Sequence, residues 1–193
     1  MIYTAHNNGA ELICLPEYGI CLGVQGSELL VGAAPLGNHA APIFMTELAK
    51  EIGVWILIGS IAVKTKRGKI VNRSVMLNDK GEVIAYYDKI HLFDVDLANG
   101  EKYRESTTIL PGNRAVVANT PWGGIGLSIC YDIRFPQLYR SLANGGAVII
   151  TVPAAFARTT GKAHWHVRLR SRAIETGCFI VAPCQTGMHG SSE

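Results

Sequence analysis

The sequence predicts an α/β fold built from layers of strands and helices. Short apolar runs, typical of buried strands, alternate with segments whose apolar residues have helical spacing, and this alternation favours a layered α/β architecture. Two of the strand-like runs are joined by a turn sequence typical of a hairpin, so we expect mixed sheets. With 193 residues, the chain is long enough for one domain with its own hydrophobic core.

The first elements follow from apolar spacing and from the residues that end each run. Residues 1–9 have the pattern of the end of a helix, which leads into a buried strand at Glu11–Leu15. Residues 41–52 have helical apolar spacing and stop at Gly53, a residue type that favours a helix C-terminus. The apolar run Val54–Val63 predicts another buried strand.

The hairpin consists of strands at Asn72–Leu77 and Val83–Tyr87, and the turn sequence at residues 78–81 connects them. In the remaining part of the chain, strands are expected at Ala115–Asn119, Gly124–Ile129, Ala147–Val152 and Cys178–Ala182, and helices at Pro136–Ala143 and Ala163–Glu175.

The composition excludes several classes of protein. Apolar residues make up 48% of the chain and charged residues 17%, which excludes intrinsic disorder, coiled coils and collagen-like chains. A net charge of +3 is too small to indicate a nucleic acid or an anionic membrane as partner. The longest apolar stretches fall short of the roughly 20 residues that span a bilayer, and residues 1–8 lack the pattern of a signal peptide.

The cysteines indicate free thiols. None of the five forms a C-x-x-C motif, so neither a zinc ribbon nor a thioredoxin motif is expected. We expect a reducing, cytoplasmic location, with Cys14, Cys21, Cys178 and Cys184 inert.

Three reactive residues lie directly beyond apolar strands. Glu17 follows the first strand, Lys89 follows the second strand of the hairpin, and Cys130 follows the run that ends at residue 129. Ligands of open α/β sheets bind just outside the carboxyl ends of the strands. We therefore expect the three side chains to converge on one pocket.

The chemistry of these three residues is coherent. A cysteine between a strand and a helix is expected to be favoured as the thiolate by the helix N-terminus. A nearby carboxylate can take the thiol proton and later activate water. A lysine and the backbone N–H after the cysteine can stabilise an oxyanion. Together, these groups indicate acyl transfer through a thioester.

Other residues suggest alternatives. His164 and His166 suggest a metal site, but residues two apart on a helix point to different sides and no third ligand has convincing spacing, so we expect no metal. A Cys–His hydrolase that uses His91 is a further hypothesis, and it requires an essential histidine. Turn-stabilising, ion-pair or solvated roles are expected for Asp132, Arg134, Arg168, Arg170 and Arg172.

The sequences around the three reactive residues resemble the signatures of the carbon–nitrogen hydrolase (nitrilase) superfamily. These signatures stand here as LPE at 15–17, YDKIHLFD at 87–94 and ICYDIRFP at 129–136. Further stretches are similar to the Nit-type amidase branch, which includes ω-amidase and deaminated glutathione amidase. They are YRES at 103–106, LPG at 110–112, TGKAHW at 160–165 and RSRAIE at 170–175.

The resemblance implies a role for each matching residue. Glu17 matches the general base, Cys130 the nucleophile, and Lys89 the residue that stabilises the tetrahedral intermediate. Glu105 matches a second glutamate, which positions the substrate and the lysine, and the N–H of Tyr131 completes the oxyanion hole. Pocket-lining positions are implied for Ala155 and Phe156, and neither a metal nor an organic cofactor is implied.

The resemblance also implies a fold: a four-layer α-β-β-α sandwich with mixed sheets, formed by residues 1–193 as one carbon–nitrogen hydrolase domain. Members of the family begin before the stretch that matches Tyr3–Leu15 and continue beyond the match to Glu193. We therefore expect a partial domain, incomplete at both termini.

The implied activity is hydrolysis of a non-peptide amide bond in a small carboxylate-bearing substrate, through a cysteine thioester, with release of ammonia or an amine. The local sequences favour an amidase over a nitrilase. The alternative is a catalytically inactive fragment that acts as a partner-dependent module. A homodimer or larger homo-oligomer is implied for the complete protein, with no nucleic acid or membrane partner.

Overall fold

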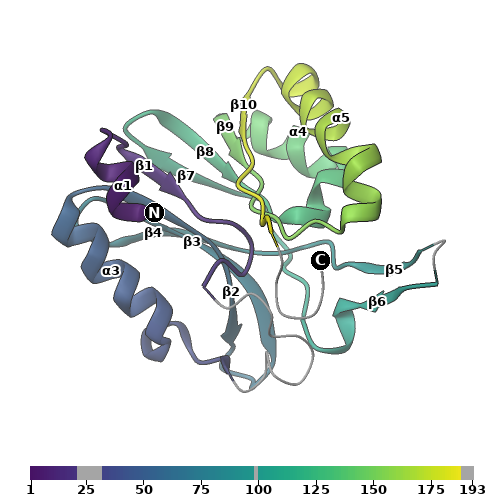
Figure 1. Ribbon diagram of the computed structural model, residues 1–193, viewed down its shortest axis with the longest axis horizontal. Helices are drawn as coiled ribbons and strands as arrows, with labels where there is room; N and C mark the ends of the chain where they lie inside the picture. The colour runs from purple at the N-terminus through teal and green to yellow at the C-terminus, as the bar shows by residue number, and fades with distance from the viewer. Residues whose placement is uncertain (21–31, 98–99, 188–193) are drawn as a thin grey trace.

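The computed structural model describes residues 1–20, 32–97 and 100–187. Two four-stranded sheets lie face to face, and helices cover the outer face of each (Figure 1). The first sheet has the order β1 (Leu12–Cys14), β2 (Trp55–Lys64), β3 (Ile70–Leu77) and β4 (Val83–Asp88). The second has the order β10 (Phe179–Val181), β9 (Ala147–Thr151), β8 (Gly123–Leu127) and β7 (Val116–Thr120).

Both sheets are mixed, as the hairpin predicted. In the first sheet β1 pairs with β2 in parallel, whereas β2, β3 and β4 are antiparallel neighbours. In the second, β8, β9 and β10 are parallel and β7 is antiparallel to β8. Helices α1 (Ile2–Asn7) and α3 (Ala40–Ile52) cover the first sheet. Helices α4 (Pro136–Asn144) and α5 (Arg158–Thr176) cover the second. The four-layer α-β-β-α sandwich is therefore confirmed.

The alternation of side chains along β2 explains how one strand serves two layers of the core. Ile56 and Ile58 pack with Met45 and Leu48 of α3, whereas Leu57 belongs to the core between the two sheets. A strand covered on both faces has a nearly continuous apolar sequence, as the run at 54–63 has. The core between the sheets and beneath α4 contains Met76, Tyr87, Leu127, Ile150 and Leu142.

Most of the predicted elements are confirmed, and three predictions of boundaries or content differ. The α3 helix ends at Gly53, which adopts the expected left-handed conformation with φ 64°. Helix α5 begins at Arg158, five positions before the predicted Ala163. Strand β8 ends at Leu127 and does not run on to Ile129. A third difference is a two-stranded hairpin, β5 (Asp94–Asp96) and β6 (Lys102–Arg104), which the pattern missed because its strands are short and polar.

Two short connections lie close to the strand ends. The 3₁₀ helices Glu105–Thr107 and Cys130–Arg134 follow β6 and β8, and a third, Leu36–Asn38, precedes α3. In the described part of the chain, no helix is both long and apolar enough to cross a bilayer.

Gly59 allows β2 to pass close to the loop that carries Glu17. A Cβ at this position would collide with the carbonyl oxygens of Leu15 and Pro16. The pairing of β2 with β3 is also irregular here, with a register shift between Ile58 and Ile61. A side chain would therefore push the loop away from the sheet.

We predict that Gly59→Ala lowers the free energy of unfolding by about 1–3 kcal/mol, because the added methyl group overpacks a closed site. Urea denaturation measures this difference. Gly37→Ala is the matched control, since a Cβ there meets nothing within 4 Å, and it should leave the unfolding midpoint unchanged. Equal stability of the two variants would contradict the close approach.

Candidate active site

The structure brings the three residues that follow the strands together. Glu17 lies beyond β1, Lys89 beyond β4, and Cys130 beyond β8. The Lys89 ammonium lies 3.1 Å from Oε1 of Glu17, and the Cys130 thiol hydrogen-bonds to the Glu17 carboxylate. Both sheets contribute, so the site lies where their strand ends meet.

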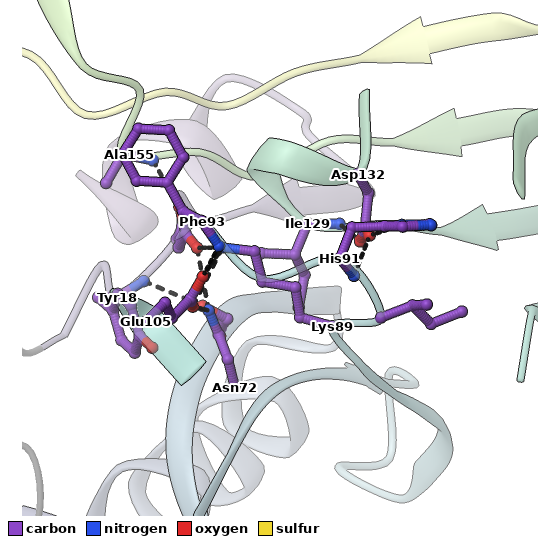
Figure 2. A network of polar contacts seen from close by, with 12 residues as sticks. Tyr18, Asn72, Lys89, His91, Phe93, Glu105, Ile129, Asp132 and Ala155 are labelled. Carbon is purple, nitrogen blue, oxygen red and sulfur yellow. Dashed lines mark hydrogen bonds and ion pairs between the residues drawn. The ribbon is translucent and has the colours of Figure 1, made fainter. Parts of the chain in front are cut away.

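Lys89 is held between two carboxylates. Its Nζ donates to Oε1 and Oε2 of Glu105, at 3.1 and 2.9 Å, as well as to Glu17, and the residue is only 2% exposed. Figure 2 shows Glu105 and Lys89 pointing toward each other from different segments. Burial alone lowers the pKa of Lys89, but the charges of Glu17 and Glu105 outweigh it and hold this pKa well above its ordinary value.

Glu17 is buried and charged because donors surround its carboxylate. The backbone N–H of Ala155 donates to Oε2 at 2.9 Å, and Nδ2 of Asn72 donates to Oε1 at 2.9 Å. Burial raises the pKa of Glu17, whereas the Lys89 charge and the hydrogen bonds lower it, and the net result is a lowered pKa. Glu17 is therefore an ionised carboxylate able to accept a proton.

The protonation state of Cys130 differs from the one predicted from the sequence. The sequence predicted a thiolate favoured by a helix N-terminus, but Cys130 starts a five-residue 3₁₀ helix, and α4 begins only at Pro136. Burial, and then the charge of Glu17, raise the pKa of the thiol well above its ordinary value. The prediction of a thiolate is wrong: Cys130 is a neutral thiol beside a base.

The backbone at Cys130 is held in an unusual conformation. Its φ of 46° is in the left-handed region, which residues other than glycine rarely adopt, and its N–H donates to the carbonyl of Pro153 at 2.9 Å. Such strain persists where the surroundings fix the backbone, and it clusters at functional sites.

Asp132 ties the cysteine turn to the segment that carries Lys89, in agreement with the turn-stabilising role expected for it. Its carboxylate accepts from the Tyr87 hydroxyl at 2.8 Å, from the Ile129 N–H at 2.9 Å and from the His91 N–H at 3.0 Å. Nδ1 of His91 also lies 2.7 Å from Oδ1 of Asp132 (Figure 2). The strand ends of both sheets thus share one buried carboxylate.

The environment of His91 argues against a Cys–His pair. Its ring stacks on Phe135 with centroids 3.6 Å apart, and its Nδ1 is engaged by Asp132. Among the residues that the structure describes, no hydrogen bond joins His91 to Cys130, whose thiol contacts Glu17 instead.

A narrow pocket of about 20 Å³ opens on Cys130. Tyr131, Ala155 and Phe156 line it, and the family resemblance implied such positions for Ala155 and Phe156. The other lining residues are Phe93, Ala157 and Thr160. The role of the Tyr131 N–H as an oxyanion donor stays a prediction.

A group of cations lies beside this pocket. The Arg134 guanidinium lies 5.5 Å from the ring centroid of Tyr131 and 5.7 Å from that of Phe156, and its Nη2 lies 3.3 Å from Nδ1 of His164. Burial, followed by the charges of Arg134 and Arg172, lowers the pKa of Arg168. Among the residues that the structure describes, Nε of Arg134 and Nε of Arg168 are buried without a hydrogen-bond partner.

Arg172 donates to the carbonyl of Ile133 at 3.0 Å and pairs with Glu175 at 2.6 Å, which is the ion-pair role expected for it. In residues 1–20, 32–97 and 100–187, no group of three or more His, Cys, Asp or Glu side chains could hold a metal ion. Cys14, Cys178 and Cys184 are free thiols, and Cys21 lies outside the described residues.

Sequence reasoning missed several contacts of the site. Asn72 contacts both glutamates, and its signal was an amide near the start of a buried strand whose two ends are apolar. Ala155 acts through its backbone N–H, which no sequence pattern reveals. Gln185 donates from Nε2 to the carbonyl of Glu17 at 3.1 Å, and the Ser60 hydroxyl accepts from the N–H of Tyr18.

Comparisons with known proteins identify the family of this chain. A model of the carbon-nitrogen hydrolase family matches residues 1–193. The chain belongs to the carbon–nitrogen hydrolase family. It is 41% identical to the deaminated glutathione amidase of Yersinia enterocolitica, over 96% of this chain and 66% of that protein. It is also 41% identical to the human deaminated glutathione amidase, over 98% of this chain and 59% of that protein.

Solved structures show the same family fold. The crystal structure of the C. elegans NitFhit protein is 32% identical to this chain, with a TM-score of 0.88, over 99% of this chain and 47% of that one. The chain thus spans between 47 and 66% of the length of these three proteins.

The raised pKa of Cys130 and the lowered pKa of Glu17 predict two rises in the alkylation rate of Cys130 by iodoacetamide. The first lies below pH 4.5, the ordinary pKa of glutamate, because Glu17 accepts the thiol proton only when it is ionised. The second lies in the alkaline range, where the thiol itself ionises. Mass spectrometry of the alkylated peptide measures both.

Glu17→Gln should abolish the first rise and leave the second. A single rise near neutral pH in the unaltered protein would contradict a neutral thiol, and a first rise that survives in Glu17→Gln would exclude Glu17 as the base.

Proposed function

We propose that this chain hydrolyses the amide bond of a small carboxylate-bearing substrate through a thioester on Cys130. The observation that carries the proposal is the buried Lys89 held between Glu17 and Glu105 beside the Cys130 thiol. This arrangement supplies a nucleophile, a base and a fixed positive charge at one pocket. Deaminated glutathione and the ω-amides of α-keto acids are the proposed substrates, since the relatives carry the name deaminated glutathione amidase.

In the first half of the reaction, Glu17 takes the proton of the Cys130 thiol as the sulfur attacks the amide carbon. The carbonyl oxygen becomes an oxyanion, which the Lys89 ammonium and the Tyr131 N–H stabilise. Glu17 then gives its proton to the amide nitrogen, the C–N bond breaks, and ammonia or an amine leaves. The acyl group remains on Cys130 as a thioester.

In the second half, Glu17 removes a proton from water, and the resulting hydroxide attacks the thioester carbon. Lys89 and the Tyr131 N–H again stabilise the oxyanion. The C–S bond breaks, the sulfur recovers the proton from Glu17, and the carboxylic acid product leaves. Glu105 keeps Lys89 charged and fixed throughout, because it contacts the ammonium with both oxygens.

We predict that Cys130→Ala lowers the rate of ammonia release by at least about a thousandfold, because no other group supplies the nucleophile. The assay is ammonia release from a panel of ω-amides, deaminated glutathione and a simple nitrile. Release from the amides, lost in the variant, supports the amidase. Release from the nitrile alone would indicate a nitrilase, and a folded chain without any release would favour the inactive, partner-dependent module.

Arg134 and Arg168 suit the carboxylate of the substrate. Both place buried Nε atoms near the pocket, and neither atom has a hydrogen-bond partner in the described part of the chain. A carboxylate satisfies a guanidinium with charge-assisted bonds. The aromatic faces of Tyr131 and Phe156 hold the Arg134 guanidinium in place.

We predict that Arg134→Ala raises KM for a carboxylate-bearing amide by about tenfold or more, because a charge-assisted hydrogen bond is lost. KM for a neutral amide of similar size should change little. Arg170→Ala, which removes an exposed charge from the same helix that carries Arg168, is the control. Equal increases in KM for the charged and neutral amides would exclude a role in carboxylate recognition.

We also propose a cytoplasmic location and self-association. Free thiols at Cys14, Cys178 and Cys184 support a reducing compartment. Large apolar side chains are exposed on α5 and β10, including Val167, Ile174 and Phe179, and such surfaces favour a homodimer or larger assembly. The small-molecule amide is the proposed ligand, with no nucleic acid or membrane.

A further inference from the structure

Asn72 lies inside the charged network, yet no step of the mechanism uses it. Its side chain on β3 is 0% exposed, and its Nδ2 donates to Oε1 of Glu17 at 2.9 Å and approaches Oε1 of Glu105 at 3.4 Å. Its backbone carbonyl accepts from the N–H of Lys89 at 2.9 Å. One neutral residue thus contacts all three charged residues, and Figure 2 labels it together with Glu105 and Lys89.

The orientation of the Asn72 amide follows from its neighbours. Carboxylates only accept hydrogen bonds, so Nδ2 must face Glu17 and Glu105; the reversed amide would place Oδ1 against two negative charges. In this orientation Oδ1 is buried and has no hydrogen-bond partner within residues 1–20, 32–97 and 100–187. A buried carbonyl without a hydrogen bond is unfavourable. Its presence indicates that the contacts of Nδ2 with the two carboxylates outweigh the hydrogen bond that Oδ1 lacks.

We propose that Asn72 is a positioning residue, which holds the ionised Glu17 carboxylate toward the Cys130 thiol and separates it from Glu105. This inference rests on the proposed function, because it concerns the same proton transfer. Two carboxylates share one ammonium here, and their negative charges repel each other. A neutral donor between them offsets the repulsion and leaves Glu17 basic, whereas a second cation would reduce its basicity.

The other groups around Glu17 limit how far its pKa can shift when Asn72 is replaced. Lys89 and the Ala155 N–H still stabilise the charged form when Asn72 is replaced, so a variant should shift the protonation of Glu17 and not abolish it. The titratable groups that face Glu17 are Tyr18, Lys89, Glu105, Cys130 and Cys184.

The test uses Asn72→Ser and Asn72→Asp, with Ser74→Ala as the control. Ser74 is equally buried on the same strand, and its hydroxyl donates to the Ile58 carbonyl at 3.3 Å. The readouts are the pH dependence of Cys130 alkylation by iodoacetamide, kcat and KM for an amide, and the thermal midpoint Tm.

In Asn72→Ser we expect the lower rise in alkylation to move up by about half a pH unit or more, because the charged carboxylate loses a donor. Asn72→Asp keeps the shape of the side chain but adds a negative charge that repels Glu17 and Glu105. It should therefore move the lower rise to a still higher pH. We expect kcat to fall about tenfold with little change in KM, since ground-state binding is not affected. Ser74→Ala should leave the rise in place even if Tm falls.

An unmoved lower rise in Asn72→Ser, with activity lost only in step with Tm, would assign Asn72 a structural role and overturn the inference. If Asn72→Asp does not fold, Asn72→Ser decides, because it adds no charge. Alkylation of Cys130 requires no amide turnover. The experiment can therefore contradict the proposed amidase function and the role of Asn72 independently. A shifted rise in a protein that hydrolyses no amide overturns the proposed function alone, and hydrolysis with an unmoved rise overturns the role of Asn72 alone.

Discussion

The burial of one ammonium between two carboxylates is the constraint on which this structure depends. Charges removed from water are tolerated only when they are paired and hydrogen-bonded, and Lys89 is 2% exposed. Glu17, Lys89 and Glu105 come from three separate segments of the chain. Their pairing therefore requires that the ends of β1, β4 and β6 lie together, and the four-layer packing brings this about.

A second buried carboxylate joins the two sheets at the same place. Asp132 accepts hydrogen bonds from Tyr87 of β4, from the loop beyond it and from the turn after β8. The Cys130 thiol thus occupies a fixed position relative to the Lys89 ammonium, although their strands belong to different sheets. Electrostatic stabilisation requires such fixed dipoles and charges, arranged before the substrate arrives.

The sequence was informative where residue type alone decides the structure. The apolar run at 54–63 specifies a buried strand, and Glu17, Lys89 and Cys130 stand out because each follows a segment with the pattern of a strand. Contacts made by the backbone leave no such trace, and so the Ala155 N–H on Glu17 was not foreseen. The protonation state of Cys130 was also missed, because it depends on burial and on a neighbour 113 positions away in the sequence.

Main-chain N–H groups hold Glu17 and Glu105, so the shape of the pocket can change without a change in the hydrogen bonds to these two carboxylates. Ala155 holds Glu17 through its backbone N–H, and Phe93 holds Glu105 through its own at 2.7 Å, while the side chains of both residues line the pocket. Replacement of either side chain changes the shape that a substrate meets and leaves the donor on the carboxylate intact. Evolution can thus vary the accepted substrate at positions 93 and 155 while the inherited reaction chemistry is preserved.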